Sequence, residues 1–259
     1  MIKTFERFKL LPFSPSRINN WIDDKSGFVL RYIYKYDFAP SCAMIRGNAI
    51  EYGFSLYFKR KYKKLNSLVK KIYQYYDDNA YFSLESKEEK KKQRDMIEPM
   101  SILLFDKITK TNSAYLSYQA SVKTEILGIP FSGFTDFIFE NDEEITVIDL
   151  KTTSQFKIRD SHIKQQVIYK KALEEKFNKK VEVKLLYCTP KKCDFIEFDS
   201  SDPIHLKTIE LNLINCADTL DKCKSNNDVS SILIPDLSDW RWNYASADKL
   251  KAREEIWGI

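Results

Sequence analysis

Two short stretches of this chain carry charged side chains where β-strands normally hold apolar ones. Asp136 lies within GFTDFIF, and Asp149 and Lys151 lie within EITVIDLKT. Because side chains alternate between the two faces of a strand, Asp149 and Lys151 share a face, and a hairpin between the stretches would bring Asp136 beside Asp149. Two carboxylates this close repel each other unless a divalent cation binds between them. The pattern predicts a metal site at one end of a sheet; the alternative is a surface ion pair between Asp149 and Lys151 with an unrelated Asp136.

The elements that must position these residues follow from the spacing of the apolar side chains. Residues 1–110 are expected to be mostly helical, with helices over 15–36, over 45–76 as one long or two abutting helices, and over 87–110 with an interruption at Pro99. A sheet core over 111–225 follows, with NDEE as a hairpin turn, a helix over 160–177, the strands VEVKLLYCT and DFIEFD, and a helix over 203–224. The aromatic segment 226–259 is hard to assign before a helix at KLKAREEIW. This order predicts an α/β or α+β domain rather than a doubly wound fold, and no glycine-rich phosphate loop is present.

Composition limits the class of protein and the kind of metal site. The 259 residues are 43% hydrophobic and 31% charged, which predicts one compact globular unit over 1–259. No apolar run approaches the length of a signal peptide core or a membrane span, so we expect a cytoplasmic protein without a membrane partner. The five cysteines form no CxxC pair, which favours reduced, partly buried thiols over disulfides or structural zinc. With only two histidines, a metal site must rely on carboxylates, and these favour Mg²⁺ or Mn²⁺.

The net charge of +5 is unevenly distributed along the chain. The segment KRKYKKLNSLVKK, residues 59–71, holds seven basic and no acidic residues, with Tyr62 among them. A basic stretch that contains an aromatic residue suits binding to a phosphate backbone. A solvated helix face is an equally good interpretation of this run alone.

Five motifs in order resemble the PD-(D/E)xK nuclease superfamily, and within it the RecB-like and Cas4-like exonuclease branch. A lone D-x-K is a weak signal, but the five ordered elements over residues 11–172 are a specific one. In that branch an S-x-S-x-I/L-x-x-W/F opening and an R-G-x-x-x-H/E helix precede a G-x-x-D strand, a D-x-K strand and a Q-x-x-x-Y helix. The matching residues here are Ser14 and Ser16, Arg46 with Gly47 and Glu51, Gly133 with Asp136, Asp149 with Lys151, and Gln165 with Tyr169.

The resemblance implies a restriction-endonuclease-like core, in which helices flank a central mixed β-sheet, and a metal-dependent DNA exonuclease. Mg²⁺ or Mn²⁺ would bind to Asp136, Asp149, the backbone carbonyl of Leu150, and Glu51, which replaces the histidine of many members of the branch. Such a cation would polarise the phosphoryl group and activate water. Lys151 would orient the attacking water and stabilise the developing charge.

The resemblance and the spacing also suggest roles for residues around these candidate metal ligands. Gln165 and Tyr169 lie one turn apart on a helix and would orient Lys151 or contact the substrate, although core packing is the alternative for Tyr169. Arg46 would touch a phosphate or form a structural salt bridge. His162, one turn before Gln165, is expected to be exposed at a helix start rather than to face the site. The DNA-binding residues we expect are Arg46, Ser14, Ser16, Arg17, Thr152, Thr153, Lys59, Arg60, Lys63 and Lys64.

The chain departs from the Cas4-like pattern at the cysteines of the iron–sulfur cluster. The segments after SRINNWI and around WRWNYASADKL lack cysteine, so we expect no cluster. Trp240, Trp242 and Tyr244 would fill that region by apolar packing; the alternative is stacking on unpaired bases.

The length leaves no room for a helicase motor, and the chain resembles stand-alone phage-type exonucleases. We expect it to act on linear DNA ends, alone or with a separately encoded helicase or annealing protein, in recombination, repair or phage DNA metabolism, in the host cytoplasm if a phage encodes it. A homo-oligomer is left open. The alternatives are a structure-specific endonuclease or nickase, and a non-catalytic nucleic-acid-binding subunit with the same fold.

Overall fold

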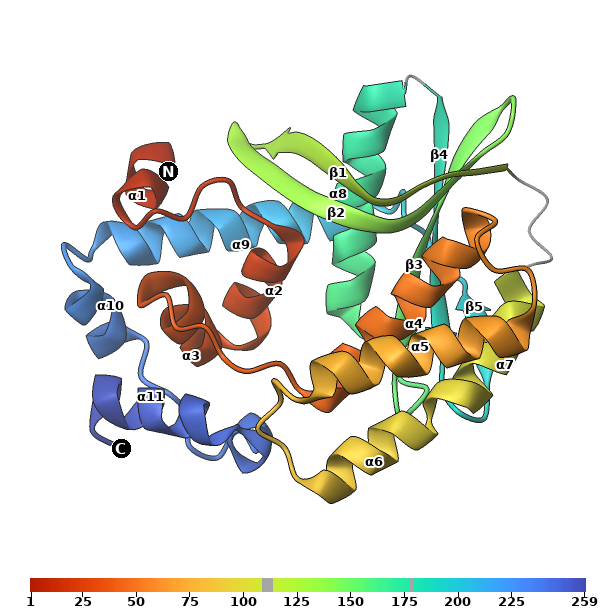
Figure 1. Ribbon diagram of the computed structural model, residues 1–259. Coiled ribbons are helices and arrows are strands. Elements are labelled where there is room, and N and C mark those ends of the chain that lie inside the picture. The colour runs from red at the N-terminus through yellow and green to blue at the C-terminus, as the bar shows by residue number, and fades with distance from the viewer. Residues whose placement is uncertain (109–113, 178) are drawn as a thin grey trace.

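A five-stranded mixed sheet forms the centre of the molecule (Figure 1). The computed structural model describes residues 1–108, 114–177 and 179–259. The strands lie in the order β1-β2-β3-β4-β5, and neighbours pair antiparallel except β3 and β4, which are parallel. Helix α8, Asp160–Phe177, connects these two parallel strands. The bounds of the strands are β1 Ala114–Ile126, β2 Ile129–Glu140, β3 Glu144–Thr152, β4 Lys180–Cys188 and β5 Cys193–Ile196. The predicted mixed sheet flanked by helices is confirmed.

The segment before the sheet is helical, as predicted, and differs in detail. The region 45–76 forms two helices rather than one, separated by the exposed basic residues that follow Phe58. The expected interruption lies at Met96, between α6 and α7, and not at Pro99, because Pro99 lies in the first turn of α7, where a proline costs no hydrogen bond. The boundary expected at residues 110 and 111 lies outside the described residues. The elements are α1 Ile2–Arg7, α2 Pro15–Asp23, α3 Lys25–Phe28, the π-helix η1 Val29–Ile33, α4 Cys42–Phe58, α5 Leu65–Ala80, α6 Lys87–Asp95 and α7 Ile97–Ile108.

The segment after the sheet returns to the N-terminal helices. Asp202 caps α9, and a capping box of Ser225 and Asp228 begins α10. In Figure 1 the helices α1, α2, α3, α9, α10 and α11 gather on one side of the molecule, opposite β5. Their bounds are α9 Pro203–Asp221, α10 Asn226–Ile232, the 3-10 helix η2 Trp240–Tyr244 and α11 Ala247–Trp257.

Three main apolar clusters hold these layers together. One joins α1, α2, α3 and η1 to α9 and to the closed end of the β1–β2 hairpin at Ile126, Ile129 and Phe131. A second packs α4, α5 and α7 on the sheet face of Phe137, Ile148 and Leu150. The third packs α8 on the opposite face. Strand β3 is thus covered on both faces, so a charged side chain on it is buried unless a cleft reaches it.

All five cysteines are buried free thiols, as predicted. Among the described residues no helix has the length and apolar content needed to cross a bilayer. Trp242 packs in an apolar cluster with Leu30 and Ala252, as expected. Trp240 and Tyr244 do not, since they are 56% and 81% exposed.

Candidate active site

Asp136 and Asp149 come together at the end of the β2–β3 ladder. The register pairs Phe137 with Ile148, and the same register continued by one residue sets Asp136 opposite Asp149. The Oδ2 atom of Asp136 accepts a hydrogen bond of 2.8 Å from the backbone N–H of Leu150. Asp149 is 0% exposed, and neither of its carboxylate oxygens has a hydrogen-bond donor among the described residues. A buried carboxylate oxygen left without a donor is costly, which makes Asp149 a candidate ligand for a cation.

Lys151 supplies the positive charge nearest to this carboxylate. Its Nζ lies 2.6 Å from Oδ2 of Asp149, in an ion pair whose angles are not those of a hydrogen bond. Burial alone would lower the pKa of Lys151, but the carboxylates of Asp149 and Asp136 outweigh it and raise the pKa above its ordinary value. Lys151 is therefore a cation at neutral pH and not a general base.

Helix α8 adds a polar chain on the same side of the sheet. Lys151 Nζ donates to Oε1 of Gln165 over 3.3 Å, and Nε2 of Gln165 donates to the Tyr169 hydroxyl over 2.8 Å. The predicted spacing of one helical turn thus brings both residues to Lys151. Tyr169 is also buried in the cluster beneath α8, so packing and positioning are both served by one side chain.

Glu51 approaches from α4, on the other side of the strands. Nε2 of Gln119 in β1 donates to Oε2 of Glu51 over 3.4 Å. Burial, then the charges of Asp136 and Asp149, raise the pKa of Glu51 well above its usual range. Electrostatically, Glu51 therefore belongs to the same acidic cluster.

Gln119 is a site residue that the sequence did not reveal. Its neighbours Tyr118 and Ala120 pair with Phe137 and Thr135, so Gln119 lies across from Asp136. Its φ of 52° is in the left-handed region, which is unfavourable for a residue other than glycine inside a strand. No alternation or spacing in the sequence signals such a backbone conformation.

The carboxylates show the charge imbalance that a cation would relieve. Burial and the neighbouring Asp149 raise the pKa of Asp136 to about 7. Within the described residues, no three His, Cys, Asp or Glu side chains already converge as a closed set of metal ligands. The donors are nevertheless all oxygen, the oxygens of Asp149 lack partners, and Glu51 needs only a side-chain rotation away from Gln119. These residues fit a hard divalent cation such as Mg²⁺ or Mn²⁺.

Two glycines of the motifs allow the elements to approach closely. A Cβ on Gly133 would lie 2.9 Å from Cε1 of Tyr169 and 3.3 Å from Cδ of Pro15, so this glycine lets α8 and the start of α2 meet over β2. A Cβ on Gly47 would lie 3.0 Å from Oγ1 of Thr152, which brings α4 against the end of β3. Both glycines thus fix the distance between helices and strands that carry candidate ligands.

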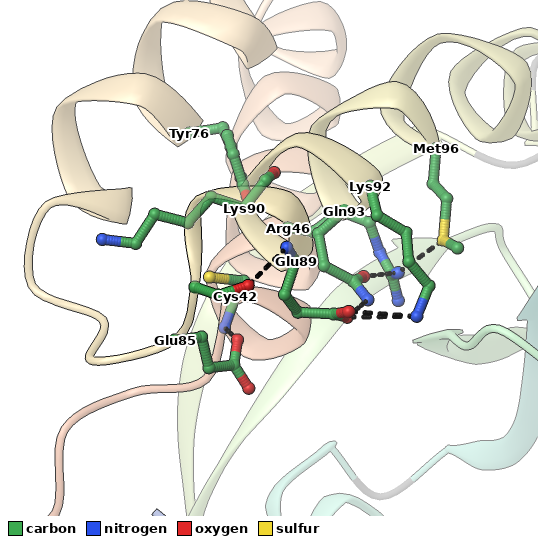
Figure 2. Close-up of polar contacts among 10 residues, drawn as sticks. Cys42, Arg46, Tyr76, Glu85, Glu89, Lys90, Lys92, Gln93 and Met96 are labelled. Atoms are coloured by element: carbon green, nitrogen blue, oxygen red, sulfur yellow. Dashed lines mark hydrogen bonds and ion pairs between the residues drawn. The ribbon is translucent and has the colours of Figure 1, made fainter.

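Arg46 does not face the site, and its expected contact with a phosphate was wrong. The side chain is 1% exposed. Its guanidinium donates to the side chains of Gln93 and Met96 on the neighbouring helices (Figure 2) and to the carbonyl of Thr152 over 3.1 Å. Burial lowers its pKa. Neither alternative from the sequence describes it, since among the described residues no carboxylate forms an ion pair with it, and it instead ties α4 to α6 and to the end of β3.

The predicted DNA-binding residues at α2 have structural partners. Ser14 caps the helix by accepting the backbone N–H of Arg17 over 3.2 Å and also lies 2.9 Å from the hydroxyl of Ser16. The guanidinium of Arg17 donates to the carbonyls of Leu10 and Pro12, so it fixes the preceding loop. Because Pro15 contacts the Gly133 position, this helix start nevertheless lies beside the site.

The other predicted DNA-binding residues lie around the ends of β3 and α4. Thr152 and Thr153 are half-buried after Lys151, where the Thr153 hydroxyl donates to the carbonyl of Gln155 over 2.6 Å. The basic residues after α4 remain exposed, and Lys59 lies over the ring of Tyr118, 5.8 Å from its centroid. Those exposed residues are Lys59, Arg60, Lys63 and Lys64.

His162 is half-buried, so the expected exposed position was wrong. Its Nδ1 hydrogen bonds with the hydroxyl of Tyr187. Burial, then the charges of Lys151 and Arg159, lower its pKa to about 3, and the ring is neutral at physiological pH.

Comparison with known proteins identifies a family by its sequence model and a solved structure with a similar fold. The model of the PD-(D/E)XK nuclease superfamily matches residues 12–230. A crystal structure from Eubacterium rectale, described as a candidate exonuclease, superposes with a TM-score of 0.57 at 12% identity, over 85% of each chain. A solved structure designated SSO0001 matches at 16% identity over 73% of this chain and 84% of that one, with a TM-score of 0.33, too low to support an argument. No curated protein matches the sequence.

Proposed function

Because the chain belongs to the PD-(D/E)XK nuclease superfamily, we propose that it is a metal-dependent DNA exonuclease that hydrolyses phosphodiester bonds at DNA ends. The observation that carries this proposal is the buried carboxylate of Asp149, without hydrogen-bond donors, beside Asp136 and Lys151. The description of the Eubacterium rectale protein as a candidate exonuclease favours action at ends over internal cleavage.

Each residue has a distinct task in this proposal. Asp136 and Asp149 would hold Mg²⁺ or Mn²⁺, together with the Leu150 carbonyl and Glu51. When bound, the cation supplies polarisation of the phosphoryl oxygens and lowers the pKa of water. Lys151, a permanent cation here, orients the attacking water and stabilises charge that develops on the phosphate. Gln165 accepts a hydrogen bond from Lys151 and is itself held by Tyr169, so the ammonium has a fixed direction.

The substrate would lie across the start of α2 and the end of α4. We assign phosphate contacts to Ser14, Ser16, Thr152 and Thr153 near the scissile bond and to the exposed basic residues after α4 farther away. The substrate would be a linear DNA end in the cytoplasm, in recombination, repair or phage DNA metabolism, with a separately encoded helicase or annealing protein as a partner.

The test is a cleavage assay with three substrates. End-labelled linear duplex, single strand and covalently closed circle are incubated with Mg²⁺ or Mn²⁺, and products are sized over time. We expect the linear forms to shorten progressively from an end while the closed circle stays intact. Cutting of the circle would replace the exonuclease by an endonuclease or nickase, and no cleavage of any form would leave a non-catalytic nucleic-acid-binding subunit.

A further inference from the structure

A cavity of about 510 Å³ lies at the beginning of α4, away from the candidate ligands. It is enclosed by α2, η1, the chain leading into α4, the α5–α6 loop, and the segment from η2 into α11. We call it the aromatic cavity; the lining residues that matter below are Asn20, Arg31, Met44, Leu84, Arg241 and Tyr244.

Two helices run from the candidate active site to this cavity. On α4, Met44 and Glu51 are seven residues apart, which is two turns on one face and about 10 Å along the axis. On α2, the first residue Pro15 adjoins Gly133 and Tyr169, while Asn20 lines the cavity one and a half turns later. A nucleotide chain with a phosphate near Glu51 would therefore have to extend about two helical turns along α4 to reach the cavity.

The two ends of α4 offer different chemistry to a nucleic acid. Beyond its C-terminal end the exposed side chains are lysines and arginines, which bind phosphates without reading the bases. At its N-terminal end the cavity presents Tyr244, 81% exposed, whose ring adjoins that of Trp240 at 6.0 Å between centroids. Bases stack on exposed aromatic rings only when they are unpaired.

The carboxylates that line the cavity have partners within the protein, and the exposed Arg31 is the lining cation that a phosphate can reach most readily. Both lining carboxylates have partners: Asp24 accepts the N–H of Gly27 over 2.8 Å and pairs with Lys249, and Glu85 accepts the N–H of Cys42 over 2.7 Å. Arg31 is exposed and lies over the ring of Phe38, and Arg241 is paired with Asp239 at the rim. The combination of stacking ring and guanidinium groups is that of a single-strand binding surface.

We propose that the aromatic cavity binds the unpaired end of the DNA strand whose phosphate lies at the candidate active site, so that single-stranded ends are the preferred substrate. The preference for cleaving single-stranded ends rests on the proposed function, whereas the binding of single-stranded DNA to the cavity does not. Binding itself needs no metal, which allows the two to be tested apart.

The binding test uses two equally exposed tyrosines. Tyr244→Ala removes the ring from the cavity, and Tyr81→Ala removes a ring that is 84% exposed but does not line the cavity. Fluorescence anisotropy with EDTA present measures the affinity for a labelled oligothymidylate of about 12 nucleotides. We expect Tyr244→Ala to weaken binding about tenfold, Tyr244→Phe to restore it, and Tyr81→Ala to leave it unchanged. Equal binding by Tyr244→Ala and wild type, or an equal loss in both alanine variants, would overturn the cavity as a binding site.

The cleavage test compares a blunt duplex with the same duplex carrying a single-stranded tail, with Mn²⁺ added. We expect wild type to prefer the tailed end and Tyr244→Ala to lose that preference while it still cuts the blunt duplex. If wild type cuts both ends equally, the substrate preference is wrong although the nuclease stands. If wild type binds the oligothymidylate through Tyr244 but cuts nothing, the proposed function fails and the cavity stands as a single-strand binding site.

Discussion

Arg46 and Asp149 are both charged and both inaccessible to solvent, but their surroundings differ. Arg46 donates to the carbonyl of Thr152 and to Gln93 and Met96, and Figure 2 shows the last two contacts. Asp149 receives no hydrogen bond within the described part of the chain, and its charged neighbours are the ammonium of Lys151 and the carboxyl group of Asp136. A buried charged group whose hydrogen bonds are all made within the protein holds the fold together. A buried charged group that still lacks hydrogen-bond partners is available to bind a ligand. Arg46 contacts the carbonyl of Thr152 and Asp149 lies beside Lys151, so both residues adjoin the end of β3 and the distinction can be tested locally.

The largest expected effect is on cleavage, from Asp149→Asn. Loss of the carboxylate should reduce the rate by about 10³-fold or more, because Asn is a poor ligand for a hard divalent cation and leaves Lys151 unpaired. The free energy of unfolding of the metal-free protein should change by less than about 1 kcal/mol, since loss of the ion pair with Lys151 is offset by relief of the repulsion between Asp149 and Asp136. Cleavage rates and urea unfolding measure the two quantities. Retained cleavage in Asp149→Asn would remove this carboxylate from the mechanism.

The next effect is on stability, from Arg46→Met. This change leaves the carbonyl of Thr152 and the side chain of Gln93 without their donor, so the free energy of unfolding should fall by about 2–4 kcal/mol. The matched control is Arg60→Met in the exposed basic segment after α4, where a change within about 0.5 kcal/mol is expected. Urea unfolding followed by circular dichroism measures both. If Arg46→Met were as stable as Arg60→Met, the conclusion that Arg46 stabilises the fold would be wrong, and its contrast with Asp149 would no longer hold.

The raised pKa of Asp136 predicts how metal binding depends on pH. Below about pH 7 the metal-free carboxyl keeps its proton, and the metal must displace it, so affinity for Mn²⁺ should fall about tenfold per pH unit below 7 and level off above. Without metal, the folded protein binds this proton more tightly than the unfolded chain, so stability falls as pH rises from about 4 to 7. Calorimetric titration with Mn²⁺ at several pH values checks the first trend and thermal unfolding in EDTA the second. A flat affinity between pH 6 and 8 would contradict both, since these two values bracket the pKa of about 7.

The smallest effect separates backbone strain from function at Gln119. Gln119→Gly should raise the free energy of unfolding by up to about 1 kcal/mol, because glycine adopts the positive φ without penalty. It should also strengthen Mn²⁺ binding several-fold, since Glu51 no longer has to give up the hydrogen bond from Gln119 before it can turn to the metal. Leu127→Gly is the control: Leu127 has a φ of 53° in the β1–β2 turn, far from the carboxylates along the hairpin. We expect the same stabilisation there with unchanged affinity for Mn²⁺. Equal affinities in the two variants would make Gln119 a merely strained residue.

The sequence predicted the fold well where apolar residues repeat with the spacing of a helix or a strand. The span of α8 follows from the helical spacing of its apolar residues, and the meeting of Asp136 with Asp149 follows from alternation and a short connection, which fix the register of a hairpin. The mixed sheet was implied by the resemblance to the nuclease superfamily. The placement of Pro99 was wrong because a proline marks the beginning of a helix as readily as its interruption.

The rest of the site depends on tertiary packing, which single-residue patterns do not encode. Arg46 could not be distinguished from a phosphate ligand, because its burial depends on α6, a helix nearly fifty residues away in the chain. Gln119 could not be found at all, because its conformation is imposed by the strand opposite it. The exposure of Trp240 and Tyr244 likewise depends on how η2 packs through Trp242 against η1 and α11, not on their residue type.

The hydrogen bond from the Leu150 N–H to Asp136 also bears on how the chain folds. It ties one candidate ligand to the backbone of the strand that carries the other, in one register only. If β2 slipped by one residue against β3, Asp136 would turn to the other face, the amide would lose its acceptor, and the apolar residues of both strands would change sides. A hairpin in the wrong register is therefore destabilised by polar and apolar losses at once. Alignment of these two strands is thus selected during folding by the same side chain that would later hold the metal.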